Sequence, residues 1–180
     1  MLLRLIILIS LLILASCAAS TPHPESDASA VPKVFDRHSR ALYLYSRARL
    51  ASNEGDYPSA LSHLRDAIEL DPLSAMLHAD VAEIKLKIGQ VPESLEYINK
   101  SIKLDPSYRP PYVMAGILMS SAGKDWEAAD YLRKAVKLDP SKEDAYLHLS
   151  LALIRLFEYE EAVSTLKSLV KINPDSILGY

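Results

Sequence analysis

The stretch Leu70-Asp71-Pro72 returns 34 residues later as Leu104-Asp105-Pro106, then as Leu138-Asp139-Pro140, and finally as Ile172-Asn173-Pro174. Four blocks of 34 residues, 41–74, 75–108, 109–142 and 143–176, therefore align without an insertion. Position 20 of the block always holds a small residue and position 24 a large aliphatic one: Ala60, Ser94, Ala128 and Ala162, then Leu64, Ile98, Leu132 and Leu166. A fixed period of this length is typical of repeat proteins, whose units bury their apolar faces against their neighbours.

Each block predicts two helices, because its apolar residues fall at helical spacing in two runs of about 14 residues. Gly55, Gly89 and Gly123 follow the first run, at the place where a helix commonly ends on a left-handed residue. Proline then ends the second run, since it lacks the amide donor and disfavours helix in the residue before it. We expect an all-α fold of stacked helical hairpins.

The pattern resembles the tetratricopeptide repeat (TPR) family, which has a large or aromatic residue at position 4, small residues at 8, 20 and 27, and proline at 32. This resemblance implies an α-solenoid of antiparallel helix pairs with four full repeats. Five residues depart from the pattern: Arg47 at position 7, Lys85 at position 11, His78 at position 4, which we interpret as a core residue, Phe157 in place of glycine, and Leu169 at position 27. Leu169 predicts a looser or displaced last pair. Because residues 177–180 are too few to form a further helix, we also expect the outer face of the last helix to leave Leu166, Leu169 and Val170 uncovered.

The resemblance also implies a concave groove lined by the first helix of each repeat. The candidate groove residues are Leu42, Tyr45, Arg49, Met76, Ala79, Glu83, Lys87, Val113, Ile117, Leu147, Leu151 and Arg155. Most are apolar, which suits an apolar or helical segment of a protein partner, with the charged members as rim charges. In the alternative interpretation, part of this stripe packs between adjacent first helices.

The N-terminus predicts an export signal. Arg4 is the one charged residue before Glu25, and the apolar run 5–15 is far shorter than the roughly 20 residues of a membrane span. Leu14-Ala15-Ser16-Cys17 resembles the lipobox of bacterial lipoproteins, which implies removal of residues 1–16 and lipid on Cys17. The alternative is an ordinary secretory signal. Ala18, rather than Asp, favours the outer membrane over the inner one.

Residues 17–33 are rich in serine and proline and read as a lipidated N-terminus and flexible tether, ahead of a TPR domain over 34–176. Residues 177–180 occupy the first four positions of a fifth repeat. From this we expect the chain to be truncated from a longer TPR protein.

Composition excludes several functions. The net charge of −3 argues against nucleic acid as a partner, and no glycine-rich phosphate loop is present. No two histidines have the i, i+4 spacing of a helical metal site, and the acidic pairs fall in predicted first turns, where the helix dipole favours them. We expect no enzyme activity, no cofactor, no metal and no small-molecule substrate.

These observations predict a lipoprotein of the bacterial envelope, anchored through Cys17, whose TPR domain lies in the periplasm and scaffolds a protein assembly. The layout resembles pilotin-type lipoproteins of type IV pili and TPR lipoproteins that serve outer-membrane barrel assembly or exopolysaccharide export. One alternative is the non-catalytic N-terminal arm of a larger enzyme such as a glycosyltransferase. Another is a secreted adaptor without lipid.

Overall fold

A computed structural model describes residues 36–174, which form eight helices and no strand. In chain order these are α2 (Arg37–Asn53), α3 (Tyr57–Leu70), α4 (Ala75–Lys87), α5 (Val91–Leu104), α6 (Pro110–Ser121), α7 (Asp125–Leu138), α8 (Glu143–Arg155) and α9 (Tyr159–Ile172). The predicted all-α fold of four helix pairs is confirmed. The predicted signal peptide, Cys17, the whole tether and the start of a fifth repeat lie outside the described residues.

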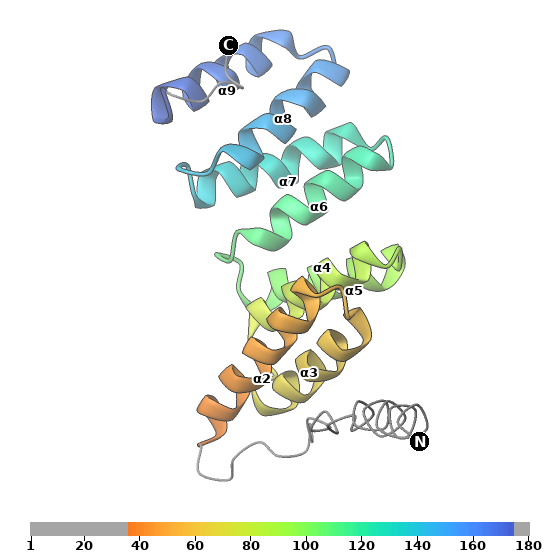
Figure 1. The fold of residues 1–180 in the computed structure, drawn as a ribbon. Coiled ribbons are helices and arrows are strands. Elements are labelled where there is room, and N and C mark those ends of the chain that lie inside the picture. The colour runs from red at the N-terminus through yellow and green to blue at the C-terminus, as the bar shows by residue number, and fades with distance from the viewer. Residues whose placement is uncertain (1–35, 175–180) are drawn as a thin grey trace, which may run out of the picture. The chain divides into compact units, whose positions relative to one another are not determined.

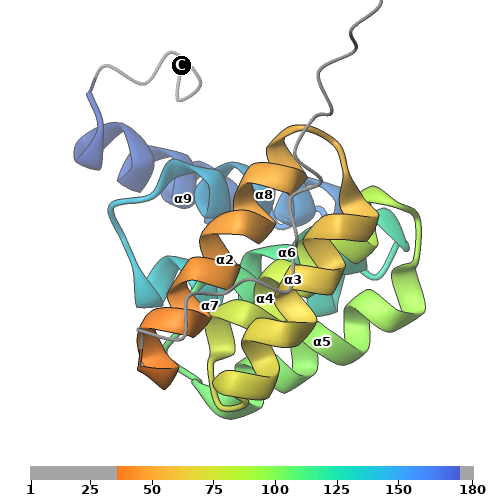
Figure 2. The same ribbon diagram turned by 60° about the horizontal axis from the view of Figure 1, so that its bottom comes forward.

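The helix pairs stack one upon the next (Figure 1). Viewed more nearly along the stack, α3 and α5 lie on one side of the first helices, and α7 and α9 lie on the other (Figure 2). The stack therefore twists as it grows, as expected when each repeat rotates slightly on its neighbour.

The turn inside each pair is built as the glycine spacing predicts. Three of these turns place glycine in the left-handed region, with φ of 80°, 77° and 73°, and the fourth places Phe157 there with φ 64°. A side chain in this region costs roughly 1 kcal/mol. The fourth repeat therefore makes the same turn as the others at the cost of backbone strain.

In two of the three turns between pairs, position 4 of the next repeat contacts the proline carbonyl. The Tyr112 hydroxyl donates a hydrogen bond of 3.0 Å to the Pro106 carbonyl, and His78 Nε2 lies 3.2 Å from the Pro72 carbonyl. His78 is 1% exposed, which confirms that it is a core residue. Histidine can stand where the third repeat has tyrosine, because its ring nitrogen reaches the carbonyl of the equivalent proline.

Small residues let the two helices of a pair approach closely. Positions 20 and 24 are fully or almost fully buried in the first three repeats. At position 8 of the third repeat, a Cβ added to Gly116 would come within 2.5 Å of Leu132 Cγ. The close approach of α6 and α7 at this point therefore requires glycine at residue 116.

The expectation for the last repeat is wrong in one respect. Leu169 is fully buried, whereas Leu166 and Val170 are half-buried. Position 27 lies on the inward side of the second helix, where Ala67 and Ala135 are also fully buried, so Leu169 does not belong to the outer face of the last helix.

Candidate functional site

The first helices α2, α4, α6 and α8 carry the predicted groove, and ten of its twelve residues are accessible. Leu42, Arg49, Lys87, Ile117, Leu151 and Arg155 are exposed, and Tyr45, Met76, Glu83 and Leu147 are half-buried. Ala79 and Val113 are buried at 2% and 7% exposure. These two residues are covered inside the stack and offer no surface to a partner.

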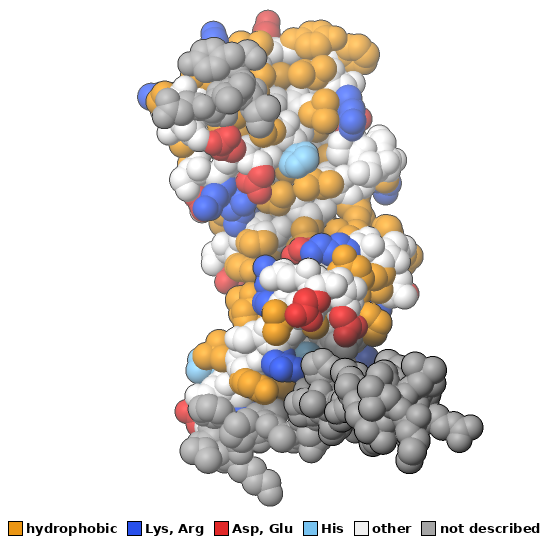
Figure 3. Space-filling view, viewed as in Figure 1, with side chains coloured by type: hydrophobic (Ala, Val, Ile, Leu, Met, Phe, Trp, Pro, Cys, Tyr) orange, Lys and Arg blue, Asp and Glu red, His pale blue; other side chains and the backbone are white. Residues whose placement is uncertain are grey.

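The predicted rim charges are engaged with one another. Arg49 lies 3.7 Å from Asp80 and 3.9 Å from Glu83, and Lys87 Nζ lies 2.8 Å from the other oxygen of Glu83. Two cations and two carboxylates thus balance across α2 and α4. A partner that lies here does not need to supply net charge. On the face shown in Figure 3, hydrophobic side chains likewise alternate with charges of both signs.

Asp80 belongs to this cluster although the sequence pattern did not select it. Its side chain is only 14% exposed, and Oδ2 has no hydrogen-bond partner among the described residues. Burial raises the pKa of the Asp80 carboxyl, while Arg49 opposes that shift. Burial and the nearby Asp80 also raise the pKa of Tyr45. The missed signal is an acidic residue at position 6, one place away from the predicted stripe.

A second polar network lies between the third and fourth repeats. Arg155 Nη1 donates to Ser120 Oγ at 2.6 Å and lies 3.4 Å from Asp125 Oδ1, and Ser120 Oγ lies 3.3 Å from the same oxygen. Arg155, predicted as a rim charge, therefore closes the seam between α7 and α8.

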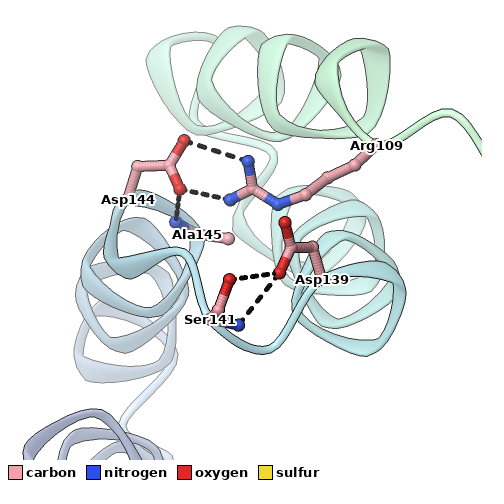
Figure 4. A network of polar contacts seen from close by, with 5 residues as sticks. All are labelled: Arg109, Asp139, Ser141, Asp144 and Ala145. Atoms are coloured by element: carbon pink, nitrogen blue, oxygen red, sulfur yellow. Dashed lines mark hydrogen bonds and ion pairs between the residues drawn. The ribbon is translucent and has the colours of Figure 1, made fainter. Parts of the chain in front are cut away.

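A third network lies where the start of α6 meets the start of α8 and the turn that precedes α8 (Figure 4). The guanidinium of Arg109, at the start of α6, binds both carboxylate oxygens of Asp144. Burial alone would raise the pKa of Asp144, but the hydrogen bonds and charge of Arg109 hold it below its usual value. In the same turn, Asp139 accepts hydrogen bonds from the Ser141 amide at 3.0 Å and its hydroxyl at 2.6 Å, which lower the pKa of Asp139. This network is structural, because Arg109 and Asp144 join the third repeat to the fourth and Asp139 and Ser141 shape the turn between them.

The seam between the second and third repeats contains an apolar cavity of about 620 Å³. Its lining residues come from α4, α5, α6 and the turn that follows α6. Its walls are almost entirely aliphatic or thioether side chains: Leu86, Val91, Leu95, Met114, Ile117, Leu118, Met119, Ser121, Ala122 and Lys124. Six of them belong to first helices, Leu86 to α4 and the other five to α6, and Ile117 is one of the predicted groove residues. The cavity therefore adjoins the concave face.

The repeat positions explain why this seam is open and the next one closed. Between α7 and α8, positions 21 and 10 hold Ala129 and Ala152, both fully buried. One repeat earlier the same positions hold Leu95 and Leu118, which are half-buried and line the cavity. Larger side chains across a seam keep helices further apart. The sequence carries this signal, but it emerges only when successive seams are compared.

The seam with the cavity also lacks a counterpart of the network that Arg155 forms with Ser120 and Asp125. Leu86, Val91 and Ser121 line the cavity at positions 12, 17 and 13, where the third and fourth repeats carry Ser120, Asp125 and Arg155. The second seam thus lacks the polar triad that draws α7 and α8 together.

Residues 36–174 contain no cluster of three or more His, Cys, Asp or Glu side chains able to hold a metal ion. Over the same range, every helix is too short or too polar to cross a membrane. The site consists of a concave face and an adjoining apolar cavity, and both features define a surface for another molecule to lie on. These features define the class of the protein as a scaffold of helical repeats that binds another molecule.

Comparison with known proteins supplies the family. Two family models, both described as tetratricopeptide repeat, match residues 45–109 and 126–179, well over half of the chain. The chain belongs to the TPR family. TPR repeats bind other proteins, so this chain is a protein-protein interaction scaffold, built on a fold that is generally non-catalytic. A search of curated proteins found no match.

Solved structures show the same fold. The crystal structure of MamA protein matches with a TM-score of 0.67 and 20% identity, over 79% of this chain and 78% of MamA. PilF of Pseudomonas aeruginosa matches with a TM-score of 0.70 and 20% identity, over 78% of this chain and 64% of PilF. YrrB, described as a TPR protein with an unusual peptide-binding site, matches with a TM-score of 0.64 and 20% identity, over 74% of this chain and 69% of YrrB.

Proposed function

We propose that this protein is a lipid-anchored scaffold of the bacterial envelope, which holds an apolar or helical segment of a partner protein along its concave face. The observation that carries the binding proposal is the exposure of large aliphatic side chains on the first helices. Leu42, Ile117 and Leu151 are 47%, 37% and 46% exposed. Apolar side chains aligned on one face favour a partner that buries them.

The state of the charges supports an apolar rather than an ionic partner. Arg49, Glu83, Lys87 and Arg155 already have ion-pair partners within the chain. Exposed pairs contribute only about 0–1 kcal/mol each, but a partner that competed for them would first have to break them. Burial of the aliphatic side chains is the larger source of affinity.

The binding proposal is tested by photo-crosslinking in the source cell, with p-benzoylphenylalanine placed at Ile117 or at Leu151. Asn99, exposed on the second helix α5, is the matched control position. We expect one discrete crosslinked species from both concave positions and none from Asn99. Crosslinking of equal yield from all three positions would contradict a concave binding face.

The anchor proposal rests on Cys17, the one cysteine of the chain, which follows the apolar run 5–15 and two small residues. A single acyl chain gives only marginal membrane binding, so the two or three chains of a bacterial lipoprotein are needed for stable anchoring. Placement in the envelope follows from this export signal and is part of the proposal.

Metabolic labelling with radioactive palmitate tests the anchor. We expect label on the wild-type protein and on Ser16→Ala, which keeps a small residue before the cysteine. Cys17→Ala should lose both the label and membrane fractionation. Label that persists in Cys17→Ala would refute lipidation at this residue.

A further inference from the structure

We propose that the cavity between the second and third repeats is an anchor pocket for a large apolar side chain of a protein segment, and that Lys124 at its edge pairs with an acidic residue beside that side chain. This inference rests on the proposed binding of a partner segment to the concave face. It names the place where that segment is held and the chemistry that it must present.

The volume and walls of the pocket suit a side chain of this kind. About 620 Å³ lies within the roughly 300–1,000 Å³ of pockets that bury organic ligands. Met114 and Met119 line it from α6. Methionine is unbranched and polarizable, so it adapts to apolar groups of different shapes and is frequent at protein-binding surfaces.

Two other cavities lack this character. A cavity of about 180 Å³ between α3, α4 and α5 is lined by Arg65, Lys85 and Lys100 together with His78. A cavity of about 370 Å³ on the third repeat is lined by Tyr112, Tyr131 and three charged residues. Neither offers continuous aliphatic walls, whereas the pocket in the second seam does.

The charge at the pocket edge favours an acidic neighbour. Lys124 is exposed and has no ion-pair partner among residues 36–174. The adjacent Asp125 is held by Arg155 and Ser120, so it is not free to neutralise Lys124. On α4, Lys87 already pairs with Glu83. Lys124 is thus the cation at the pocket edge that is available to pair with a carboxylate of the bound segment.

The test uses two fluorescein-labelled amphipathic peptides of 16 residues that share one tryptophan and three leucines. One peptide carries Glu and the other Lys at its polar positions. Binding to the full-length chain is followed by fluorescence anisotropy. We expect the Glu peptide to bind about fivefold or more tightly than the Lys peptide, and Lys124→Glu to reverse this order.

Filling the pocket separates this inference from the proposed function. Ala122→Trp places a large side chain in the cavity and should weaken the Glu peptide about tenfold or more. Glu54→Trp, at the same repeat position in the first repeat, should leave binding unchanged. Circular dichroism confirms that each variant remains helical.

Several outcomes would overturn the inference. If Leu151→Glu weakens the Glu peptide but Ala122→Trp does not, the concave face binds and the pocket plays no part. If neither peptide binds at millimolar protein, the pocket does not take a peptide side chain, while the crosslinking experiment still decides the proposed function. If sodium laurate binds to wild type and is lost in Ala122→Trp while neither peptide binds, the pocket holds an acyl chain.

Discussion

Arg155 on α8 donates a hydrogen bond of 2.6 Å to the hydroxyl of Ser120 on α6, a residue 35 positions earlier in the chain. This bond joins the third and fourth repeats at a seam whose facing alanines are fully buried. The preceding seam carries leucines at the same two positions and has no equivalent bond. One structural unit, repeated four times, thus closes one junction and leaves another open for a ligand.

The closed seam should not tolerate added volume. Ala129 is fully buried in the cluster that α7 forms with α8. Ala129→Leu should therefore destabilise the protein by about 1–3 kcal/mol through overpacking. Ala122→Leu adds the same atoms to the lining of the open cavity and should be neutral or stabilising. Urea unfolding of both variants measures the difference. Equal losses in the two variants would mean that the seams do not differ in packing.

A substitution at Phe157, in the turn between α8 and α9, should stabilise the protein rather than destabilise it. Phe157 is 76% exposed and has φ 64°, and its ring contacts Tyr159 edge-on with centroids 6.1 Å apart. Phe157→Gly removes the strain and little buried area, so we expect it to stabilise the fold by up to about 1 kcal/mol.

The reverse change in the third repeat is the matched control for that turn. Gly123 has φ 73° and open space around its Cβ position, so Gly123→Phe should destabilise by about 1 kcal/mol through strain alone. Thermal unfolding reports both shifts. A destabilised Phe157→Gly would show instead that the ring pair contributes more than the strain costs.

His78 should make stability depend on pH below neutrality. Burial lowers the pKa of His78 from 6.5, and the charge of Lys100 adds to this shift, whereas the hydrogen bond from the His78 ring to the Pro72 carbonyl opposes it. The folded protein therefore holds His78 neutral at pH values where the unfolded chain binds a proton. The contribution is complete above about pH 6.5 and is lost as the pH falls toward the lowered folded value.

His78→Tyr tests this account. Tyr112, at the same repeat position, shows that a tyrosine there donates a hydrogen bond to the carbonyl of the equivalent proline. We expect the variant to fold and to lose less stability than wild type between pH 7 and pH 5. The carboxylates are common to both proteins, so the difference between the two urea-unfolding series isolates residue 78. Parallel series would contradict a buried neutral histidine.

The sequence was sufficient for the helix pairs because their determinants are local. Glycine after the first helix and Asp-Pro after the second are read within a few residues, and small residues at positions 8 and 20 repeat in every block. The His78 assignment succeeded for the same reason, since Tyr112 marks what that position requires.

The surface was predicted less well because burial there depends on contacts between repeats. Val113 and Arg49 fall on the same predicted stripe, yet Val113 packs inside the stack and Arg49 pairs across helices with Asp80. The cavity was missed because it depends on the pairing of Leu95 with Leu118 across a seam. No position within a single repeat reveals that pairing.

The most direct test of the binding account is methyl NMR of the full-length chain, labelled at Ile, Leu, Val and Met methyl groups and titrated with the Glu peptide. We expect the shift changes to concentrate at Leu95, Met114, Ile117 and Leu118 around the cavity and to extend along the concave face to Leu151. Changes centred instead on Leu61, Ile68 and Val81, which line the cavity between α3, α4 and α5, would contradict it.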